Sequence, residues 1–171
     1  SICSGVPRIL DMRSRGITVA LASDGPGSNN RQDMFEVLKA TVLLQKVHHL
    51  DAMALQPEDA LTMACRDGAV AFGAADALGA IEPGRKADLV VVDLDSVFTA
   101  PVHRVPSALV FCASPANVTH VLVDGRMVVD DGVVTTVDEE ALRAEAEASA
   151  RSVFRRAGVE TRLTQDRRWR R

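Results

Sequence analysis

The pattern of apolar and polar residues divides the chain near residue 78. Before it, apolar residues recur at helical spacing over 6–15, from Asp33 to His48 and from Pro57 to about Cys65. Asp67-Gly68 is expected to end the last of these helices, and small residues over 69–74 predict a short successor. Ile17 to Ser23 instead form one mostly apolar run, which predicts a strand buried on both faces, as in a parallel sheet.

After residue 78 the apolar runs become short. They predict strands at 89–94, 108–112, 118–123, 126–129 and 133–136. Asp124-Gly125 and Asp131-Gly132 separate the last three runs, and Asp-Gly is a strong signal for a β-hairpin. We therefore expect a small, antiparallel, β-sandwich-like layer. A helix capped by Asp138 should follow and extend to about Ala157.

The predicted strand 17–23 leads directly into Asp24 and a loop of Gly, Pro, Ser and Asn residues. The carboxyl ends of parallel strands are where α/β folds place their chemistry. Glycine at 25 and 27 allows the backbone to approach a ligand closely, and Ser28 and Asn29 add short polar side chains. From the residues alone, a second interpretation is equally good: Asp24 caps the turn or the helix that follows.

Composition narrows the class of protein. With 171 residues, 47% hydrophobic and 25% charged, the chain holds one ordinary domain or two small pieces of larger ones. A net charge of −3 favours no nucleic-acid partner, and the basic end 167–171 is interpreted as a solvated tail or a clasp on a partner subunit. No apolar run reaches the roughly 20 residues that cross a bilayer, and no signal peptide opens the chain. Cys3, Cys65 and Cys112 are far apart, which predicts the reducing cytoplasm.

Several stretches together resemble the amidohydrolase superfamily, in particular its S-adenosylhomocysteine/methylthioadenosine deaminases and s-triazine hydrolases. Ala22-Ser-Asp-Gly-Pro-Gly-Ser-Asn-Asn30 resembles the motif at the end of the eighth barrel strand. Leu61-Thr-Met-Ala-Cys-Arg-Asp-Gly-Ala69 is similar to that branch's helix pair, and Leu78 to Asp93 resembles its long signature. Val121 to Gly132 is similar to the hairpin that closes its C-terminal β-domain.

The resemblance implies an α/β fold: the C-terminal part of a (β/α)8 TIM-barrel metal hydrolase plus a small β-sandwich-like domain. The expected division is the last βα portion of the barrel at 1–77, the β-domain at 78–137, and a helix with a basic tail at 138–171. It also implies one divalent metal, Zn²⁺ or alternatively Fe²⁺. Asp24 would contact the metal and its water and shuttle the proton. Ser28 and Asn29 would brace the loop or line the pocket.

The sequence lacks most of the family's metal ligands. The His-x-His pair of the first strand is absent, and His48, His49, His103 and His120 stand where none can replace it. Because one acid cannot hold a catalytic metal, the chain, which does not begin with Met, is expected to be the C-terminal part of an enzyme. Most of the metal ligands would then lie outside it.

The activity implied for the whole enzyme is hydrolytic deamination of a nucleoside- or nucleobase-like heterocycle by metal-activated water. One alternative is an s-triazine-type chlorohydrolase or another hydrolase of ring C–N bonds. A second alternative is a non-catalytic fragment that acts as an assembly surface. The expected partners are a small heterocyclic substrate and further copies of the chain in a homo-oligomer, with no nucleic acid and no membrane.

Overall fold

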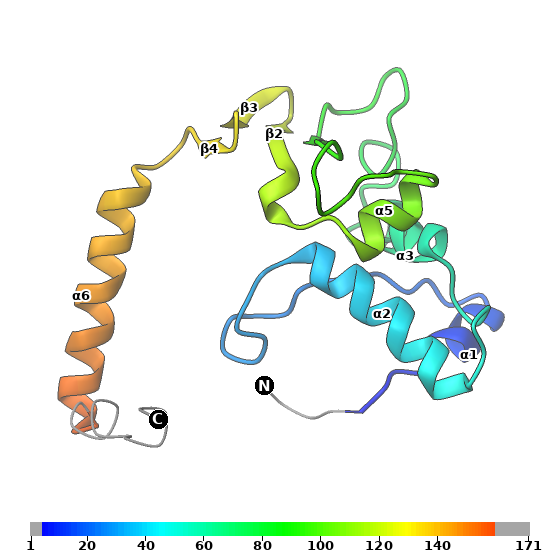
Figure 1. The fold of residues 1–171 in the computed structure, drawn as a ribbon, viewed down its shortest axis with the longest axis horizontal. Helices are drawn as coiled ribbons and strands as arrows, with labels where there is room; N and C mark the ends of the chain where they lie inside the picture. Colours follow the sequence, from blue (N-terminus) through cyan, green and yellow to red (C-terminus); the bar gives the residue numbers. More distant parts are fainter. Residues whose placement is uncertain (1–4, 160–171) are drawn as a thin grey trace. The chain divides into compact units, whose positions relative to one another are not determined.

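The computed structural model describes residues 5–159 (Figure 1). Its helices are α1 (Ile9–Ser14), α2 (Met34–His49), α3 (Pro57–Ala64), α4 (Arg66–Ala71), α5 (Val105–Phe111) and α6 (Glu139–Ala157), with a 3-10 turn at Pro115–Asn117. Its strands are β1 (Leu89–Val92), β2 (Val118–Val123), β3 (Arg126–Asp130) and β4 (Val133–Val134). The chain separates into two compact units at the junction between Val133 and Val134.

The core of the first unit is built by helices. Asp33 begins α2, and its side chain accepts hydrogen bonds from the backbone N–H groups of Phe35 and Glu36, so the predicted cap is confirmed. One face of α2 is buried, and α2 contacts both α3 and α5. The buried apolar cluster consists of Ile9, Leu38, Val42, Leu55, Ala60, Met63 and Val110.

The strands form one sheet in the order β1-β2-β3-β4, and β2 pairs antiparallel with both β1 and β3. Asp124 and Gly125, between β2 and β3, have φ angles of 49° and 78°. Asp131 and Gly132, between β3 and β4, have φ angles of 46° and 77°. Two successive positive φ angles suit a tight hairpin turn that matches the twist of its strands. The prediction of antiparallel hairpins is confirmed.

The strand predicted at 17–23 is wrong. This segment forms no strand; Ile17 is 52% exposed, while Val19 and Leu21 are partly buried and pack against the core cluster. Leu21 makes one backbone hydrogen bond, from its N–H to the Met63 carbonyl oxygen at 3.3 Å. A parallel strand needs a neighbouring strand for its ladder of hydrogen bonds. The described residues offer 17–23 no such neighbour.

Two other expectations are also corrected. The strand predicted at 108–112 is helix α5, which has a proline in its first turn and buries Ala108 and Val110. The fixed φ angle of proline suits a helix start, and this outweighs the β propensity of the short apolar run that follows. The break between α3 and α4 falls at Cys65, so Asp67 and Gly68 lie inside α4 instead of ending a helix.

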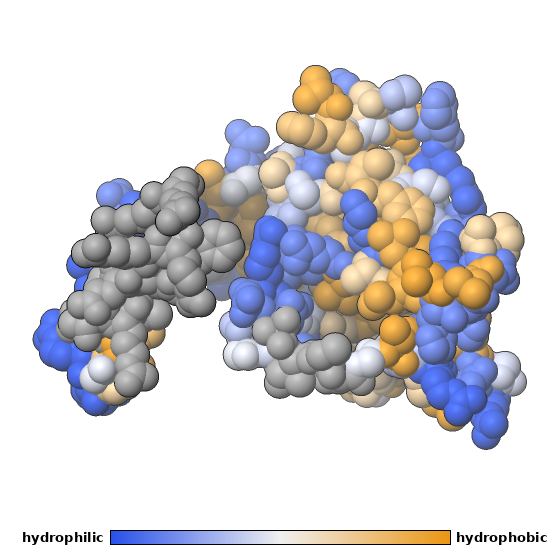
Figure 2. Space-filling model, turned by 60° about the horizontal axis from the view of Figure 1, so that its bottom comes forward, coloured by the Kyte–Doolittle hydropathy of each residue, from blue (hydrophilic) through white to orange (hydrophobic). Residues whose placement is uncertain are grey.

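Large apolar side chains lie open on the first unit. Leu50 is 92% exposed, Phe72 91% and Ile81 87%. On the face shown in Figure 2, orange apolar residues form patches between blue polar ones. Soluble monomers rarely expose wide apolar patches, so this surface is suited to contact with further polypeptide. No helix in the described part of the chain is both long enough and apolar enough to span a membrane.

Candidate active site at Asp24

Asp24 lies in the loop between the 17–23 segment and α2, with a φ angle of 60°. Aspartate is one of the few residues other than glycine that adopt this left-handed conformation readily. Its carboxylate accepts a hydrogen bond at each oxygen. The Gly25 N–H donates to Oδ1 at 2.7 Å, and the Ser28 hydroxyl donates to Oδ2 at 2.8 Å.

These hydrogen bonds stabilise the ionised form of the carboxylate. The Ser28 hydroxyl and then the Gly25 N–H lower the pKa of Asp24 below its ordinary value, and the smaller effect of desolvation opposes them. Asp24 is therefore an exposed anion at neutral pH. A carboxylate oxygen has two lone pairs, so each oxygen keeps one for a further donor or a cation.

Asn29 stabilises the same loop through a hydrogen bond to the residue before Asp24. Its side-chain N–H group donates to the Ser23 carbonyl oxygen at 2.8 Å, and the Gly25 carbonyl oxygen accepts from the N–H groups of Ser28 and Asn29. The structure thus brings the three predicted site residues, Asp24, Ser28 and Asn29, into one hydrogen-bonded turn. The Gly25 N–H was not predicted to take part, although an acid directly before glycine is a common turn signal.

Among residues 5–159, no three His, Cys, Asp or Glu side chains come together as a group that could hold a metal ion. His48 and His49 end α2 with their ring centroids 5.0 Å apart. His120, on β2, lies 3.3 Å from Asp130 of β3, measured from Nε2 to Oδ1. Asp24 therefore supplies one metal-binding side chain, which is fewer than a catalytic metal needs.

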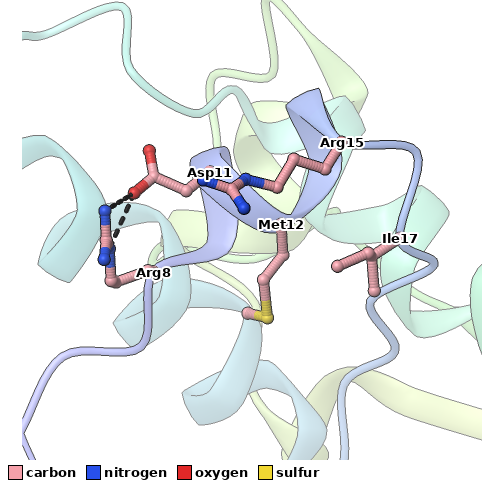
Figure 3. Close-up of a pocket in the computed structure, with 5 residues that line it drawn as sticks. All are labelled: Arg8, Asp11, Met12, Arg15 and Ile17. Carbon is pink, nitrogen blue, oxygen red and sulfur yellow. Dashed lines mark hydrogen bonds and ion pairs between the residues drawn. The ribbon is translucent and has the colours of Figure 1, made fainter.

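Two cavities of the first unit are lined by other residues than Asp24. One, of about 220 Å³, lies at α1 and is lined by Arg8, Asp11, Met12, Arg15 and Ile17 (Figure 3). Arg8 and Asp11 form an ion pair on its rim, and Figure 3 shows Met12 and Ile17 as its apolar side chains. The other, of about 330 Å³, lies between α5 and the loop that precedes it. Asp24 lines neither cavity, and its side chain is exposed.

The stretch 78–88 connects the helices to the sheet. Arg85 donates to the carbonyl oxygens of Ala75 and Leu78 and pairs with Glu82. The Gly125 N–H, in the β2–β3 turn, donates to the Ala87 carbonyl oxygen at 3.0 Å. The Asp88 carboxylate accepts from the Asp124 N–H at 2.7 Å. This stretch therefore fixes the hairpin against the helical layer.

Comparison with known proteins identifies the family. The model of the amidohydrolase family matches residues 1–128. A 5-methylthioadenosine/S-adenosylhomocysteine deaminase of Acetivibrio thermocellus is 37% identical over 152 residues, which cover 89% of this chain and 35% of that protein. A 5'-deoxyadenosine deaminase of Methanosarcina acetivorans is 36% identical over 158 residues, covering 92% and 36%. The chain belongs to the amidohydrolase family and spans about a third of the length of these relatives.

Solved structures of similar fold include a deaminase, like these sequence relatives, and a chlorohydrolase. The crystal structure of an adenosine deaminase from Xanthomonas campestris with bound zinc has a TM-score of 0.85 and 35% identity, covering 90% of this chain and 35% of that one. Atrazine chlorohydrolase TrzN from Arthrobacter aurescens, complexed with zinc, has a TM-score of 0.72 and 28% identity, covering 82% and 31%. The resemblance to the amidohydrolase superfamily is thereby confirmed.

Proposed function

We propose that this chain forms the C-terminal part of a metal-dependent amidohydrolase that hydrolytically deaminates a nucleoside- or nucleobase-like heterocycle. The observation that carries the proposal is the 37% identity to a 5-methylthioadenosine/S-adenosylhomocysteine deaminase over 89% of this chain. The chain covers 35% of that relative, so the activity is proposed for the longer protein that contains the chain. The chain alone is expected to be inactive.

The proposed fold of that protein is a (β/α)8 barrel followed by a β-sandwich-like domain. Residues 1–77 would be the last βα portion of the barrel, 78–137 would belong to the β-domain, and 138–171 would be the C-terminal helix and tail. The extended segment 17–23, with Val19 and Leu21 toward the core and Ile17 exposed, supports a place for it beside a strand from elsewhere in the polypeptide. The open apolar surface of the first unit supports the same proposal.

The proposed cofactor is one divalent metal ion, with Zn²⁺ favoured because the solved relatives named above contain zinc. Asp24 fits one position in such a site because it is exposed, anionic, and keeps a free lone pair on each oxygen. The remaining ligands would come from polypeptide outside residues 5–159. When bound, the metal would supply charge that lowers the pKa of water toward about 7.

The proposed role of Asp24 is to hold and transfer a proton at its carboxylate. A carboxylate with a lowered pKa is a weak base, so Asp24 takes a proton only from an acidified donor and returns it readily to a departing amine. Ser28 and Gly25 would keep the carboxylate in one orientation through their two hydrogen bonds. Asn29 would hold the loop through the Ser23 carbonyl oxygen.

A second candidate is hydrolysis of an s-triazine, because chlorohydrolase TrzN shares this fold at a TM-score of 0.72. The test uses the complete polypeptide that carries this chain, loaded with Zn²⁺. Ammonia release from 5'-deoxyadenosine and S-adenosylhomocysteine is compared with chloride release from a chlorotriazine. Ammonia release with a kcat/KM at least about 100-fold higher is expected, whereas faster chloride release would favour the second candidate. No release from either class would refute the enzyme and leave an assembly role.

We propose a small heterocyclic substrate as the partner at this site, and we propose that the protein binds neither nucleic acid nor membrane. Cytoplasmic location is also proposed, because Cys65 and Cys112 are free thiols.

A further inference from the structure

Four Asp-Gly pairs occur in the chain, at 24–25, 67–68, 124–125 and 131–132. This dipeptide is prone to a spontaneous rearrangement, in which the backbone nitrogen of the glycine attacks the side-chain carboxyl carbon of the aspartate. Glycine favours the attack because it has no Cβ to crowd that nitrogen. In a folded chain, the rate depends on whether the glycine N–H lies against the carboxyl or is bound elsewhere.

The two pairs in the hairpin turns have their glycine nitrogens bound to the backbone. The Gly125 N–H donates to the Ala87 carbonyl oxygen at 3.0 Å, and the Gly132 N–H donates to the Thr119 carbonyl oxygen at 2.8 Å. Either hydrogen bond must break before the nitrogen can attack. Reaction at these pairs therefore requires a local opening of the fold, which costs free energy.

The pair at 67–68 is held by a helix. Gly68 lies inside α4, and the Asp67 carboxylate accepts a hydrogen bond from Arg13 at 3.0 Å. Side chains of a helix lean toward its N-terminus, so the Asp67 side chain points away from the backbone nitrogen of the next residue. This pair also needs a local opening before it can react.

Asp24 and Gly25 have the opposite arrangement. Within residues 5–159, the Gly25 N–H donates to no backbone oxygen and instead donates to Oδ1 of Asp24 at 2.7 Å. The carbon that carries this oxygen is the atom that the nitrogen attacks, so the two reacting groups are already in contact. The Asp24 side chain is exposed, so solvent can exchange protons with the reacting atoms.

We infer that Asp24 is a site of spontaneous isomerisation to isoaspartate, and that it reacts ahead of the three other Asp-Gly pairs. The Gly25 nitrogen forms a bond to the carboxyl carbon of Asp24, and one carboxyl C–O bond breaks. A water molecule leaves, made from the carboxyl oxygen, the amide proton and one proton from solvent. Water then opens the five-membered ring at either carbonyl, which returns aspartate or gives isoaspartate.

The product changes the geometry of the candidate site. Isoaspartate adds one methylene group to the backbone, and its free carboxylate is attached directly to Cα. The carboxylate is thereby moved from the position in which it accepts the 2.8 Å hydrogen bond from the Ser28 hydroxyl. A consequence that rests on the proposed function is that isomerisation removes a metal ligand, and that bound metal protects Asp24 by holding its carboxylate. The lowered pKa of Asp24 slows the first step, so geometry alone favours this site over the others.

Peptide mapping tests the inference in the complete polypeptide, prepared without metal and incubated at pH 6. Trypsin places the four pairs on separate peptides, which end at Arg31, Arg85, Arg126 and Arg143. Electron-transfer fragmentation distinguishes isoaspartate, which should accumulate at Asp24 at least about tenfold faster than at any other pair. In concentrated urea the four rates should agree within about threefold, because every glycine nitrogen is then free. Equal rates in the folded protein, or a faster rate at another pair, would overturn the inference.

Gly25→Ala is the matched variant. Its φ angle lies outside the left-handed region and an added Cβ would meet nothing within 4 Å, so the loop and its N–H should be kept. The methyl group crowds ring closure, so isoaspartate at Asp24 should form at least about fivefold more slowly, with the rate at Asp131 unchanged. An unchanged rate at Asp24 would refute attack by the Gly25 nitrogen.

Zinc separates this inference from the proposed function. Added Zn²⁺ should slow isomerisation at Asp24 at least about tenfold and leave the rates at the other three pairs unchanged. If Asp24 reacts first with and without Zn²⁺ at one rate, the isomerisation site is confirmed and the proposed metal ligand is refuted. If Asp24 does not react ahead of the other pairs without metal, the isomerisation site is refuted, whatever Zn²⁺ does.

Discussion

The Ser28 hydroxyl donates a 2.8 Å hydrogen bond to Oδ2 of Asp24, four residues earlier in the same loop. This bond is the largest cause of the lowered pKa of that carboxyl. The loop conformation that places Ser28 beside Asp24 therefore also stabilises the ionised form of the proposed catalytic carboxylate.

We predict that Ser28→Ala raises the pKa of Asp24 toward its ordinary value, because the variant loses the main hydrogen bond to the ionised form. A carboxyl ¹³C NMR titration of the chain measures it. Asn29→Ala is the matched control, since Asn29 bonds the Ser23 carbonyl oxygen and not the carboxylate. An unchanged pKa in Ser28→Ala, or an equal rise in both variants, would contradict the assignment.

The same bond predicts a pH dependence of stability. The pKa of Asp24 is lower in the folded chain than in the unfolded chain, so its ionised form contributes stability above the unfolded pKa. That contribution is lost as the pH falls through the folded pKa. Ser28→Ala should therefore be slightly less stable than wild type at pH 7, and the difference should shrink in acid. Urea unfolding at pH 7 and pH 3 measures it; a gap that widens in acid would have the wrong sign.

Gly79 gives a sharper stability test. It has a φ angle of 85°, and an added Cβ would lie 2.9 Å from both the Ala69 Cβ and the Cys65 carbonyl oxygen. Gly84 has a similar φ angle of 89°, but an added Cβ there would meet open space. Gly84→Ala should lower the free energy of unfolding by about 1 kcal/mol through backbone strain alone. Gly79→Ala should cost a further ~1–3 kcal/mol through overpacking.

Thermal unfolding of both glycine variants, followed by circular dichroism, separates the two causes. Equal losses in the two variants would show that the close contact at Gly79 carries no energetic weight.

Gln45 is fully buried in α2, and its Oε1 has no hydrogen-bond partner among the described residues. Its side-chain N–H group donates to the Pro7 carbonyl oxygen at 2.9 Å, and that oxygen also accepts from the Ile9 N–H. Gln45→Leu removes the unpaired acceptor and leaves Pro7 with one bond. Its effect on the free energy of unfolding should stay within about 1 kcal/mol.

Gln45→Glu should behave differently, because burial raises the pKa of an unpaired carboxyl. Its stability should fall as the pH rises from 4 to 8, by several kcal/mol in total. Urea unfolding of both Gln45 variants across this range measures the effect. A Glu variant whose stability did not change with pH would show that residue 45 is open to water.

The sequence predicted best those features that local chemistry decides. Asp33 and Asp138 begin α2 and α6 as expected, and both Asp-Gly pairs form the hairpin turns. The strand expected at 17–23 depended on neighbouring strands, which no local pattern can supply, so an apolar run alone could not establish it. The helix α5 was missed because Val110 and Phe111 favour strands, although Pro106 marked a helix start.

The candidate site was predictable in part. The residue types around Asp24 indicated a polar loop, but the acceptance of one hydrogen bond by each carboxylate oxygen depends on the backbone path through the Asp24 φ angle of 60°. The remaining metal ligands could not be found, because the described residues hold no group of three or more His, Cys, Asp or Glu side chains that could bind a metal ion.

The role of Asp24 is tested most directly by Asp24→Asn in the complete polypeptide loaded with Zn²⁺. Asparagine tolerates the left-handed backbone and can still accept from the Gly25 N–H, so the fold should be kept. Asp76→Asn, the same change at an exposed carboxyl in another loop, is the control. We expect Asp24→Asn to lower the kcat of ammonia release at least about 100-fold and to weaken zinc binding, with no more than the small loss of stability expected for Ser28→Ala when both chains are unfolded without metal. Wild-type turnover in Asp24→Asn would contradict the proposed role of this residue.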